Sequence, residues 1–241
     1  MNKFKISLII PAYNEEKYIG TCLEYAIKNS NNLFMEIIVI DNASTDNTSA
    51  IALKYPNVRV VREDKKGLTK ARQRGYEESK GDILAYIDAD TRMPELWCDV
   101  LIKEFDKNKN LVCLSGPCFY YDISLIKKIF VKYVYWYLLG MPTYYFVGYM
   151  VQGSNFAIKR ETLNKMNGFD TNIEFYGEDT NIARRASEFG KVKFKSDFII
   201  YASGRRFYNQ GLIKTGLIYM SNFLSEAFTH KPTTNNYKDF R

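Results

Sequence analysis

Short apolar runs alternate with helix-like stretches from the N-terminus to Asp90, and this alternation most constrains the fold. The strand-like runs are Ile6–Ile10, Glu36–Ile40, Val58–Val61 and Asp82–Ile87. The helical stretches between them are Glu15–Asn29, about Asp46–Lys54, and Thr69–Ser79. We expect Asn14 to cap the first of these helices. Strands that alternate with helices are typical of α/β proteins, so the sequence predicts a doubly wound, mostly parallel sheet.

The second half of the chain has a less regular pattern. It predicts a helix after Pro94 and another from Glu178 to Gly190. The expected strands are Val112–Gly116, Ser154–Ile158, Lys191–Phe194 and Phe198–Ala202. A final helix is predicted with one apolar face, formed by Ile213, Leu217, Met220, Leu224 and Phe228.

Two aspartates, Asp88 and Asp90, directly follow the last apolar run of the first half. Side chains two residues apart on a strand point the same way, so these carboxylates can face one ligand. At the carboxyl edge of an open α/β sheet, such a pair can grip a hard cation that holds the phosphates of a nucleotide. The alternative is that Asp88 ends the strand and Asp90 caps a helix begun near Pro94.

Charge and cysteine content narrow the class of partner. The chain has 34 Lys and Arg against 27 Asp and Glu, an excess of seven. Nine basic and three acidic residues follow from Lys191 onward, so most of the excess (9 − 3 = 6) lies late in the chain. Such a segment attracts phosphates or anionic lipid, and no RNA-binding signature is present. Four unpaired cysteines and no recognisable signal peptide lead us to expect a cytoplasmic protein.

Six short motifs occur in a fixed order that resembles the family 2 glycosyltransferases of the GT-A fold. They are Pro11-Ala12-Tyr13-Asn14-Glu15, Asp41-Asn42-Ala43-Ser44-Thr45-Asp46, Gly67 through Ala71-Arg72, Asp88-Ala89-Asp90, Gly153-Ser154-Asn155-Phe156 and Gly177-Glu178-Asp179. The resemblance covers roughly residues 5 to 206. It implies an α/β GT-A fold and single-domain organisation, with a nucleotide-binding half (1–91) and an acceptor half (92–206). An aromatic helical insert (122–150) and a C-terminal helix with a basic tail (207–241) complete the expected domain.

The resemblance also implies a role for each motif. The expected nucleotide-sugar contacts are Pro11, Tyr13, Glu15, Asp41, Asn42, Arg72, Asp88, Arg205 and Arg206. Asp88 and Asp90 would bind Mg²⁺ or Mn²⁺ beside the diphosphate, and Asp179 would be the catalytic base of an inverting displacement. The acceptor would lie against Glu178, Gly153, Ser154 and Asn155.

Several departures from the family pattern shape the functional prediction. Asn42 and Ala43 replace the commoner Asp-Gly of this motif. The replacement affects the predicted contact with the nucleotide base, and we expect UDP more than GDP as the nucleotide. No Trp follows Arg206, unlike in processive relatives, so transfer of one sugar is favoured. A haloacid-dehalogenase-like phosphatase is disfavoured because Arg92 stands where that motif needs Thr or Val. A nucleotidyltransferase of related fold and a non-catalytic membrane-surface protein remain the alternatives.

Nine of the twenty residues in Phe130–Tyr149 are aromatic, and no charge occurs from Tyr133 to Ile158. A transmembrane span is disfavoured because Gly140 and Pro142 interrupt the run and tyrosine prefers the membrane interface. A single span here would also place Asp90 and Asp179 on opposite sides of the membrane, which would divide the expected site. We expect interfacial helices on a membrane or acceptor groove; the alternative is a helical pair packed on the sheet. The prediction is therefore a peripheral protein on the inner face of the cell membrane, with a lipid-linked acceptor such as a polyprenyl phosphate.

Overall fold

The computed structural model describes residues 4–173 and 177–229. Its first half contains β1 (Ile6–Ala12), α1 (Ile19–Asn29), β2 (Phe34–Asp41), α2 (Thr48–Ala52), β3 (Val58–Arg62), α3 (Leu68–Glu78), β4 (Ile83–Ile87), β5 (Thr91–Arg92) and α4 (Trp97–Lys107). Then follow β6 (Leu111–Ser115), β7 (Cys118–Tyr120), α5 (Leu125–Ile129), the π-helix η1 (Phe130–Gly140), α6 (Met141–Val147), β8 (Asn155–Lys159) and α7 (Arg160–Lys165). The last elements are α8 (Glu178–Ser187), β9 (Lys191–Phe194), β10 (Ile200–Ala202), α9 (Arg205–Gln210) and α10 (Leu212–Thr229).

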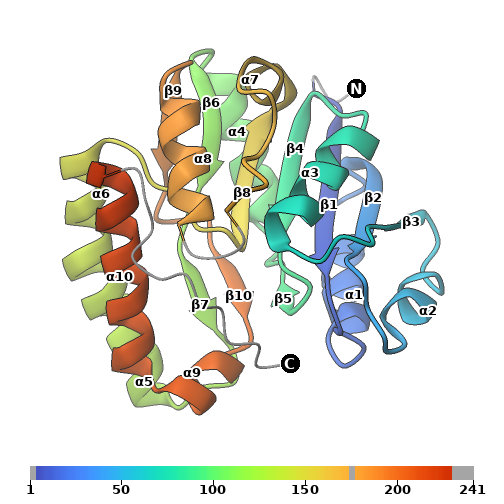
Figure 1. Ribbon diagram of the computed structural model, residues 1–241, viewed down its shortest axis with the longest axis horizontal. Coiled ribbons are helices and arrows are strands. Elements are labelled where there is room, and N and C mark those ends of the chain that lie inside the picture. The colour runs from blue at the N-terminus through green and yellow to red at the C-terminus, as the bar shows by residue number, and fades with distance from the viewer. Residues whose placement is uncertain (1–3, 174–176, 230–241) are drawn as a thin grey trace.

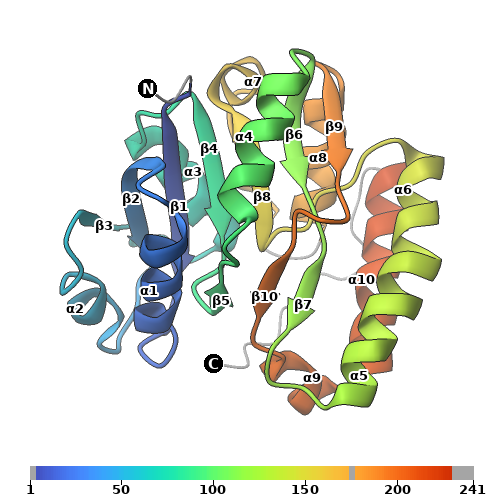
Figure 2. The same cartoon turned by 180° about the vertical axis from the view of Figure 1, so that it is seen from behind.

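A seven-stranded sheet with the order β3-β2-β1-β4-β8-β6-β9 forms the centre of the fold. All its neighbouring strands are parallel except β8, which is antiparallel to both β4 and β6. Helices α3, α7 and α8 cover one face and α1 and α4 the other (Figures 1 and 2). Strands β1 and β4 are buried along their whole length, as expected of continuous apolar strands between two helical layers. The predicted doubly wound, mostly parallel sheet is confirmed.

The first helix begins later than the sequence suggests. Asn14 is not its N-cap: α1 starts at Ile19, and Asn14 has a left-handed backbone with φ of 51°. The Asn14 side chain accepts a hydrogen bond from the Thr45 backbone N–H at 2.9 Å, and Thr48 accepts one from the Glu15 backbone N–H at 2.8 Å. Asn14 therefore joins the loop after β1 to the loop after β2, because its short polar side chain tolerates this conformation.

The aromatic insert forms one long rod made of α5, η1 and α6, which lies beside α10 at one end of the molecule (Figures 1 and 2). The sequence suggested that Gly140 and Pro142 interrupt this segment, but the helical rod continues through both residues. Pro142 lies in the first turn of α6, where its missing N–H costs little. A π-helix of this length is unusual, because π turns mostly occur singly.

The rod has one packed and one exposed side. Trp136 points inward: its ring stacks on Phe194 at 5.2 Å, and its indole N–H donates to the Cys118 carbonyl at 2.9 Å. The exposed side carries large apolar residues: Leu125, Ile126, Ile129, Phe130, Tyr133, Tyr137, Leu138, Leu139, Tyr145 and Phe146. The segment thus packs one side against the domain and leaves large apolar side chains exposed on the other. Among the residues that the structure describes, we find no helix with the length and apolar character needed to cross a bilayer.

Helix α10 has the opposite orientation to the one its apolar pattern predicts. Leu217 and Leu224 are 66% and 38% exposed, whereas Thr215, Asn222 and Glu226 are buried. The side chains of Ile213 and Phe228 lie outside the described set. The helix turns its polar face inward because α8 presents polar partners there. Asn181 of α8 donates to a Glu226 oxygen at 3.1 Å, and Arg184 lies 3.7 Å from the same oxygen.

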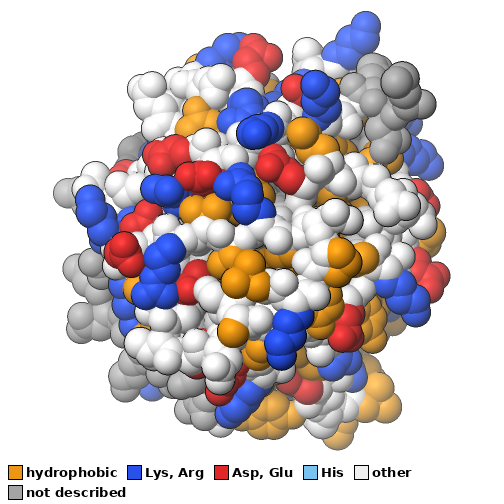
Figure 3. All heavy atoms as spheres, turned by 90° about the vertical axis from the view of Figure 1, so that its right-hand side faces the viewer, with side chains coloured by type: hydrophobic (Ala, Val, Ile, Leu, Met, Phe, Trp, Pro, Cys, Tyr) orange, Lys and Arg blue, Asp and Glu red, His pale blue; other side chains and the backbone are white. Residues whose placement is uncertain are grey.

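Charged side chains of both signs are interspersed over the face that carries β3 and α2 at the right of Figure 1 (Figure 3). The described part of this face therefore lacks the continuous basic patch that nucleic-acid binding uses. The most C-terminal basic residues of the predicted tail, Lys231, Lys238 and Arg241, lie outside the described residues.

Candidate active site

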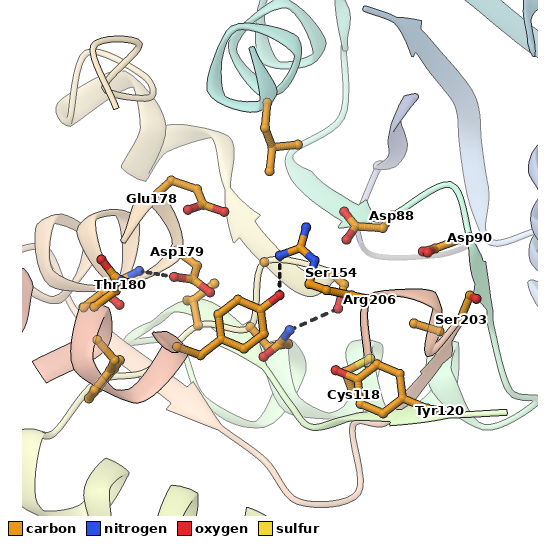
Figure 4. Close-up of a pocket in the computed structure, with 18 of the residues that line it drawn as sticks. Asp88, Asp90, Cys118, Tyr120, Ser154, Glu178, Asp179, Thr180, Ser203 and Arg206 are labelled. Carbon is orange, nitrogen blue, oxygen red and sulfur yellow. Dashed lines mark hydrogen bonds between the residues drawn. The ribbon is translucent and has the colours of Figure 1, made fainter. Parts of the chain in front are cut away.

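A cavity of about 200 Å³ opens at the carboxyl edge of the central sheet. This is where open α/β sheets place their ligand sites. Eleven of the fifteen predicted site residues line it: Pro11, Glu15, Arg72, Asp88, Asp90, Gly153, Ser154, Glu178, Asp179, Arg205 and Arg206. The other four, Tyr13, Asp41, Asn42 and Asn155, are not among its lining residues. Figure 4 shows Asp88 and Asp90 on one side of the cavity and Glu178 and Asp179 on the other.

Asp88 and Asp90 directly follow β4 and are both partly buried. Among the described residues, no group of three or more His, Cys, Asp and Glu is arranged to hold a metal ion. Two carboxylates alone leave most positions of a Mg²⁺-like ion open, which suits an ion that also binds substrate phosphates. The donor set therefore fits a cation shared between the protein and a diphosphate.

Arg205, at the start of α9, connects the loop after β1 to the loop after β4. Its guanidinium donates to both oxygens of Glu15, at 2.8 and 2.5 Å, and lies 3.1 Å from an Asp90 oxygen. Burial is the largest single effect on the pKa of Arg205 and lowers it. The Glu15 and Asp90 carboxylates together outweigh burial, so the pKa of Arg205 is raised. Glu15 is 3% exposed, so this forked contact is a buried ion pair. Arg205 thus holds Asp90 in place while it neutralises Glu15.

We expect Arg205→Ala to lower the free energy of unfolding by about 3 kcal/mol, because it removes the guanidinium that binds both oxygens of the buried Glu15 carboxylate. Urea unfolding in EDTA measures the loss. Arg59→Ala is the matched control: Arg59 contacts Glu78 at 2.7 Å but is 42% exposed, so its loss should cost no more than about 1 kcal/mol. Equal losses in the two variants would show that the Glu15–Arg205 pair is no stronger than a surface pair.

Arg72, on α3, is fully buried and faces the same cavity. Its Nη2 donates to the Gly153 carbonyl at 2.9 Å, and its Nη1 lies 3.7 Å from Glu178. Within the described residues, Nε and Nη1 have no hydrogen-bond partner. A Cβ at Gly153 would lie 2.7 Å from the guanidinium, so this close approach requires glycine. A buried cation with unused donors is suited to an anionic ligand, such as a diphosphate.

Glu178 and Asp179 begin α8, where backbone N–H groups favour acids. Gly177, just before them, has φ of 85°, which only glycine adopts at little cost. Burial, followed by the neighbouring Asp179, raises the pKa of Glu178 to about 7, while Arg72 opposes the shift. Burial also raises the pKa of Asp179, against the opposing effect of Arg72. The two carboxyls therefore hold protons at a higher pH than ordinary acids.

The raised pKa of Glu178 predicts a pH dependence of stability. The folded protein binds more protons than the unfolded chain between about pH 4.5 and 7, so the free energy of unfolding should fall as pH rises through this window. The fall should be on the order of 3 kcal/mol, since each pKa unit corresponds to about 1.4 kcal/mol. Urea unfolding of Glu178→Gln should show this component removed. The control Glu188→Gln alters an acid of similar chemistry that is 61% exposed, and should retain the wild-type slope.

The loop after β2 is held by its own side chains. Asp41 accepts hydrogen bonds from the Ser44 backbone N–H at 2.9 Å, from Arg62 at 2.8 Å, and from the Ser49 hydroxyl. Asn42 bonds the backbone of residues 63–67 through both ends of its amide. These contacts tie the Asn42 side chain to the neighbouring loop, and its predicted contact with the nucleotide stays a prediction.

Ala43 and Tyr13 complete this region. Ala43 has φ of 60°, a left-handed conformation that glycine adopts more readily, which explains the Asp-Gly of the commoner motif. Lys66 lies 3.9 Å from the centre of the Tyr13 ring and fixes its orientation.

Asn155, which was expected to contact the acceptor, is not among the residues that line the cavity. Its side chain is fully buried and binds three partners: the Trp97 indole at 2.8 Å and the Gly116 and Phe198 carbonyls at 3.2 and 2.6 Å. A short amide at the start of β8 thus ties the strand to neighbouring elements. Its role is structural, because no polar atom of the side chain remains to meet a ligand.

Sequence reasoning placed the insert near an acceptor groove but named no residue of the insert or of α10 as part of the site. Tyr135 and Trp136 of η1, and Tyr219, Met220 and Phe223 of α10, line it. The Tyr219 hydroxyl accepts a 2.5 Å hydrogen bond from Arg206, which occupies the centre of the cavity (Figure 4). The signal that could have located Tyr219 was the helical spacing of Thr215, Asn222 and Glu226, a polar stripe on an otherwise apolar helix.

The fold resembles that of solved structures bound to nucleotide sugars. Mannosyltransferase PcManGT from Pyrobaculum calidifontis, in complex with GDP-Man and Mn²⁺, superposes with a TM-score of 0.68 and 21% identity over 94% of this chain and 64% of that one. Glucosyl-3-phosphoglycerate synthase from Mycobacterium tuberculosis, with Mn²⁺, UDP-glucose and phosphoglyceric acid, gives 0.64 and 20% over 93% and 80%. The chain therefore has the GT-A fold.

The sequence identifies the family within this fold class. The family model of Glycosyl transferase family 2 matches residues 7–166, and the chain belongs to that family. The uncharacterized glycosyltransferase YibD of Escherichia coli is 40% identical over 121 residues, which are 48% of this chain and 35% of YibD. Glycosyltransferase GlyG of Streptococcus pneumoniae is 31% identical over 124 residues, 49% of this chain and 40% of GlyG. The chain spans less than half the length of either relative.

Proposed function

We propose that this chain transfers one sugar from a nucleotide-diphosphate sugar to an acceptor hydroxyl or phosphate, with inversion at the anomeric carbon. One observation carries the proposal: a single cavity holds the Asp88/Asp90 pair and the Glu178/Asp179 pair on opposite sides. The first pair suits a donor diphosphate and the second suits proton removal from an acceptor. Residues 1–91 would then form the nucleotide half and 92–206 the acceptor half of one domain.

The donor side is built from cations and carboxylates. Asp88 and Asp90 would hold Mg²⁺ or Mn²⁺, which supplies charge neutralisation for the leaving nucleoside diphosphate. Arg72 offers its unused Nε and Nη1 donors to the same diphosphate. Pro11 and Glu15 border the cavity at the end of β1, toward which the base and ribose would lie. Tyr13 and Asp41, which do not line the cavity, keep their predicted role beside the base, and UDP is the nucleotide we favour.

The acceptor side is built around Asp179. Its Oδ1 accepts a hydrogen bond from the Thr180 backbone N–H at 2.8 Å, which fixes the carboxylate. We propose that Asp179 removes the proton of an acceptor hydroxyl while that oxygen attacks the anomeric carbon and the nucleoside diphosphate leaves. One base and one direct displacement give inversion. Glu178 and Ser154 border the same space and would orient the acceptor, while Gly153 holds Arg72 through its carbonyl.

Slow donor hydrolysis tests the function directly. The protein should release nucleoside diphosphate from one member of a panel of UDP- and GDP-sugars when Mn²⁺ is present. Asp88→Asn should abolish the release, and the preferred member identifies the donor. Release of pyrophosphate from a nucleoside triphosphate with a sugar phosphate would instead identify a nucleotidyltransferase. No turnover of any nucleotide would favour the non-catalytic membrane-surface alternative.

We further propose that the protein acts on a lipid-linked acceptor at the inner face of the cell membrane. The exposed apolar side of the α5–η1–α6 rod supports this, since patches of this kind commonly mark membrane or protein contacts. Lys127 and Lys132 lie on the same rod, and such lysines favour anionic lipid. Among the relatives, a dolichol-phosphate mannosyltransferase of Pyrococcus furiosus is 36% identical over 111 residues.

Membrane attachment predicts that the protein floats with anionic liposomes at low salt and is partly released at high salt. The residues to replace should be aromatic and exposed on the rod. Trp136 is buried and therefore unsuitable, whereas Tyr145 and Phe146 are 76% and 81% exposed. The double substitution to Ser should weaken the salt-resistant fraction about tenfold, because that fraction depends on apolar burial. Leu53→Ser, at the end of α2 on the far side of the molecule, is the control. No flotation of the wild type at low salt would exclude the membrane surface.

A further inference from the structure

A second cavity of about 150 Å³ lies between the π-helix η1 and helix α10. Phe130, Tyr135 and Leu139 of η1 and Gly216, Leu217 and Met220 of α10 form most of its wall. No charged side chain is among the described residues that line it. An apolar cavity of this size excludes ordered water and accepts a hydrocarbon about as large as benzene. A sugar or nucleotide would be a poor occupant, because its hydroxyls would lose their hydrogen bonds.

The inner end of this cavity adjoins the candidate active site. The two cavities share a wall of five residues: Tyr120, Tyr135, Phe207, Tyr219 and Met220. Tyr219 accepts a hydrogen bond from Arg206, so a cation stands at the junction of the polar and apolar spaces. A ligand that crosses this junction would therefore have an anionic or polar end on the Arg206 side and an apolar part on the Tyr219 side.

The outer end of the cavity reaches the surface. Phe130, Leu139 and Leu217 are 38%, 45% and 66% exposed, so they form its mouth. Phe130 and Leu139 also belong to the exposed apolar side of the insert rod. An apolar path therefore continues from the active site, between η1 and α10, to the surface that we propose faces lipid. The inward polar face of α10 is consistent with this, because it leaves Leu217 at the mouth.

We propose that this cavity binds the first part of the hydrocarbon chain of the acceptor, next to the head group. The inference rests on the proposed function, since it assumes that a lipid-linked acceptor enters the active site. The head group would lie near Arg206 with its nucleophilic oxygen toward Asp179, and the chain would pass between η1 and α10. Burial of each methylene from water gives the cavity its affinity for the chain.

Gly216 provides a way to fill the cavity without touching the catalytic groups. A Cβ at this position would meet only the Tyr135 ring, at 3.8 Å, which is ordinary contact. Gly216 lies in the interior of α10, where replacement of glycine favours the helix by up to about 1 kcal/mol. Gly216→Leu should therefore fold and block the cavity. Gly216→Ala is the matched control, because it makes the same backbone change and leaves most of the space open.

The experiment measures the binding of butyl, octyl and dodecyl phosphate by calorimetry, each below its micelle concentration. In the wild type and in Gly216→Ala, affinity should rise at least tenfold from butyl to octyl phosphate. In Gly216→Leu this gain should vanish, while UDP binding with Mn²⁺ stays unchanged. An equal gain in Gly216→Leu, or no dependence on chain length, would overturn the proposal. Failure of donor hydrolysis with an intact chain-length effect would remove the proposed function and leave the apolar site.

Discussion

Replacement of Asp179 by Asn is expected to lower sugar transfer by about two to four orders of magnitude, the usual scale for loss of a general base. Asn retains the oxygen that accepts the Thr180 backbone N–H, so the local structure should persist. The affinity for donor nucleotide should stay near the wild-type value, because Asp179 lies across the cavity from Asp88 and Asp90. Single-turnover rates and nucleotide titration measure the two quantities separately.

Glu178→Gln is the matched comparison, because it neutralises the adjacent carboxyl of the same cavity. It should reduce transfer less than Asp179→Asn if Glu178 only orients the acceptor. The product of the wild-type enzyme should have the inverted anomeric configuration. A larger loss in Glu178→Gln would move the base to Glu178, and a product with retained configuration would exclude direct displacement.

The second large effect concerns the metal. In the wild type, UDP or GDP should bind more tightly with Mn²⁺ than with EDTA, because the cation bridges the carboxylates and the diphosphate. Asp88→Asn and Asp90→Asn should each weaken Mn²⁺-dependent binding by at least about tenfold, given that loss of a ligand's supporting contacts alone costs 10–100-fold. Isothermal titration with and without Mn²⁺ measures this difference.

The two aspartate variants differ in a useful way. Asp90 also lies 3.1 Å from Arg205, so Asp90→Asn should lower stability as well as metal affinity. Asp88 has no such ion pair among the described contacts, which makes Asp88→Asn the cleaner test. Asp99→Asn, on the exposed side of α4, is the control for loss of one negative charge. Equal nucleotide affinity with and without metal in the wild type would refute the metal assignment.

Local sequence patterns located most of the candidate site, because chain direction and strand period determine where a side chain leaves a sheet. Asp88 and Asp90 were found this way, since they end an apolar strand. Glu178 and Asp179 were assigned through the Gly177-Glu178-Asp179 motif, as the family resemblance implies. All four line the predicted cavity.

Two side chains have distant partners that the sequence did not reveal. Asn155 has the polarity of an acceptor contact, yet the Trp97 indole and two carbonyls occupy its amide. Trp136 belongs to the aromatic run Phe130–Tyr149 that was expected on a membrane or acceptor groove, yet its ring stacks on Phe194 inside the domain. In both cases a partner far away in sequence decided between burial and exposure, and no local pattern carries that information.

The sequence by itself determined the doubly wound sheet and the place of the two acidic pairs, because hydrophobic periodicity and turn chemistry act over a few residues. Only the tertiary structure decided which loops meet. It brings Arg205 to Glu15, 190 residues away, and thereby joins the C-terminal segment to the nucleotide side. It also turns the polar stripe of α10 inward, against the hydrophobic pattern, because the hydrogen-bonding partners of Glu226 lie on α8. The cavity between η1 and α10 follows from that orientation, since helix–helix packing depends on shape and partners that the sequence pattern of one helix does not contain.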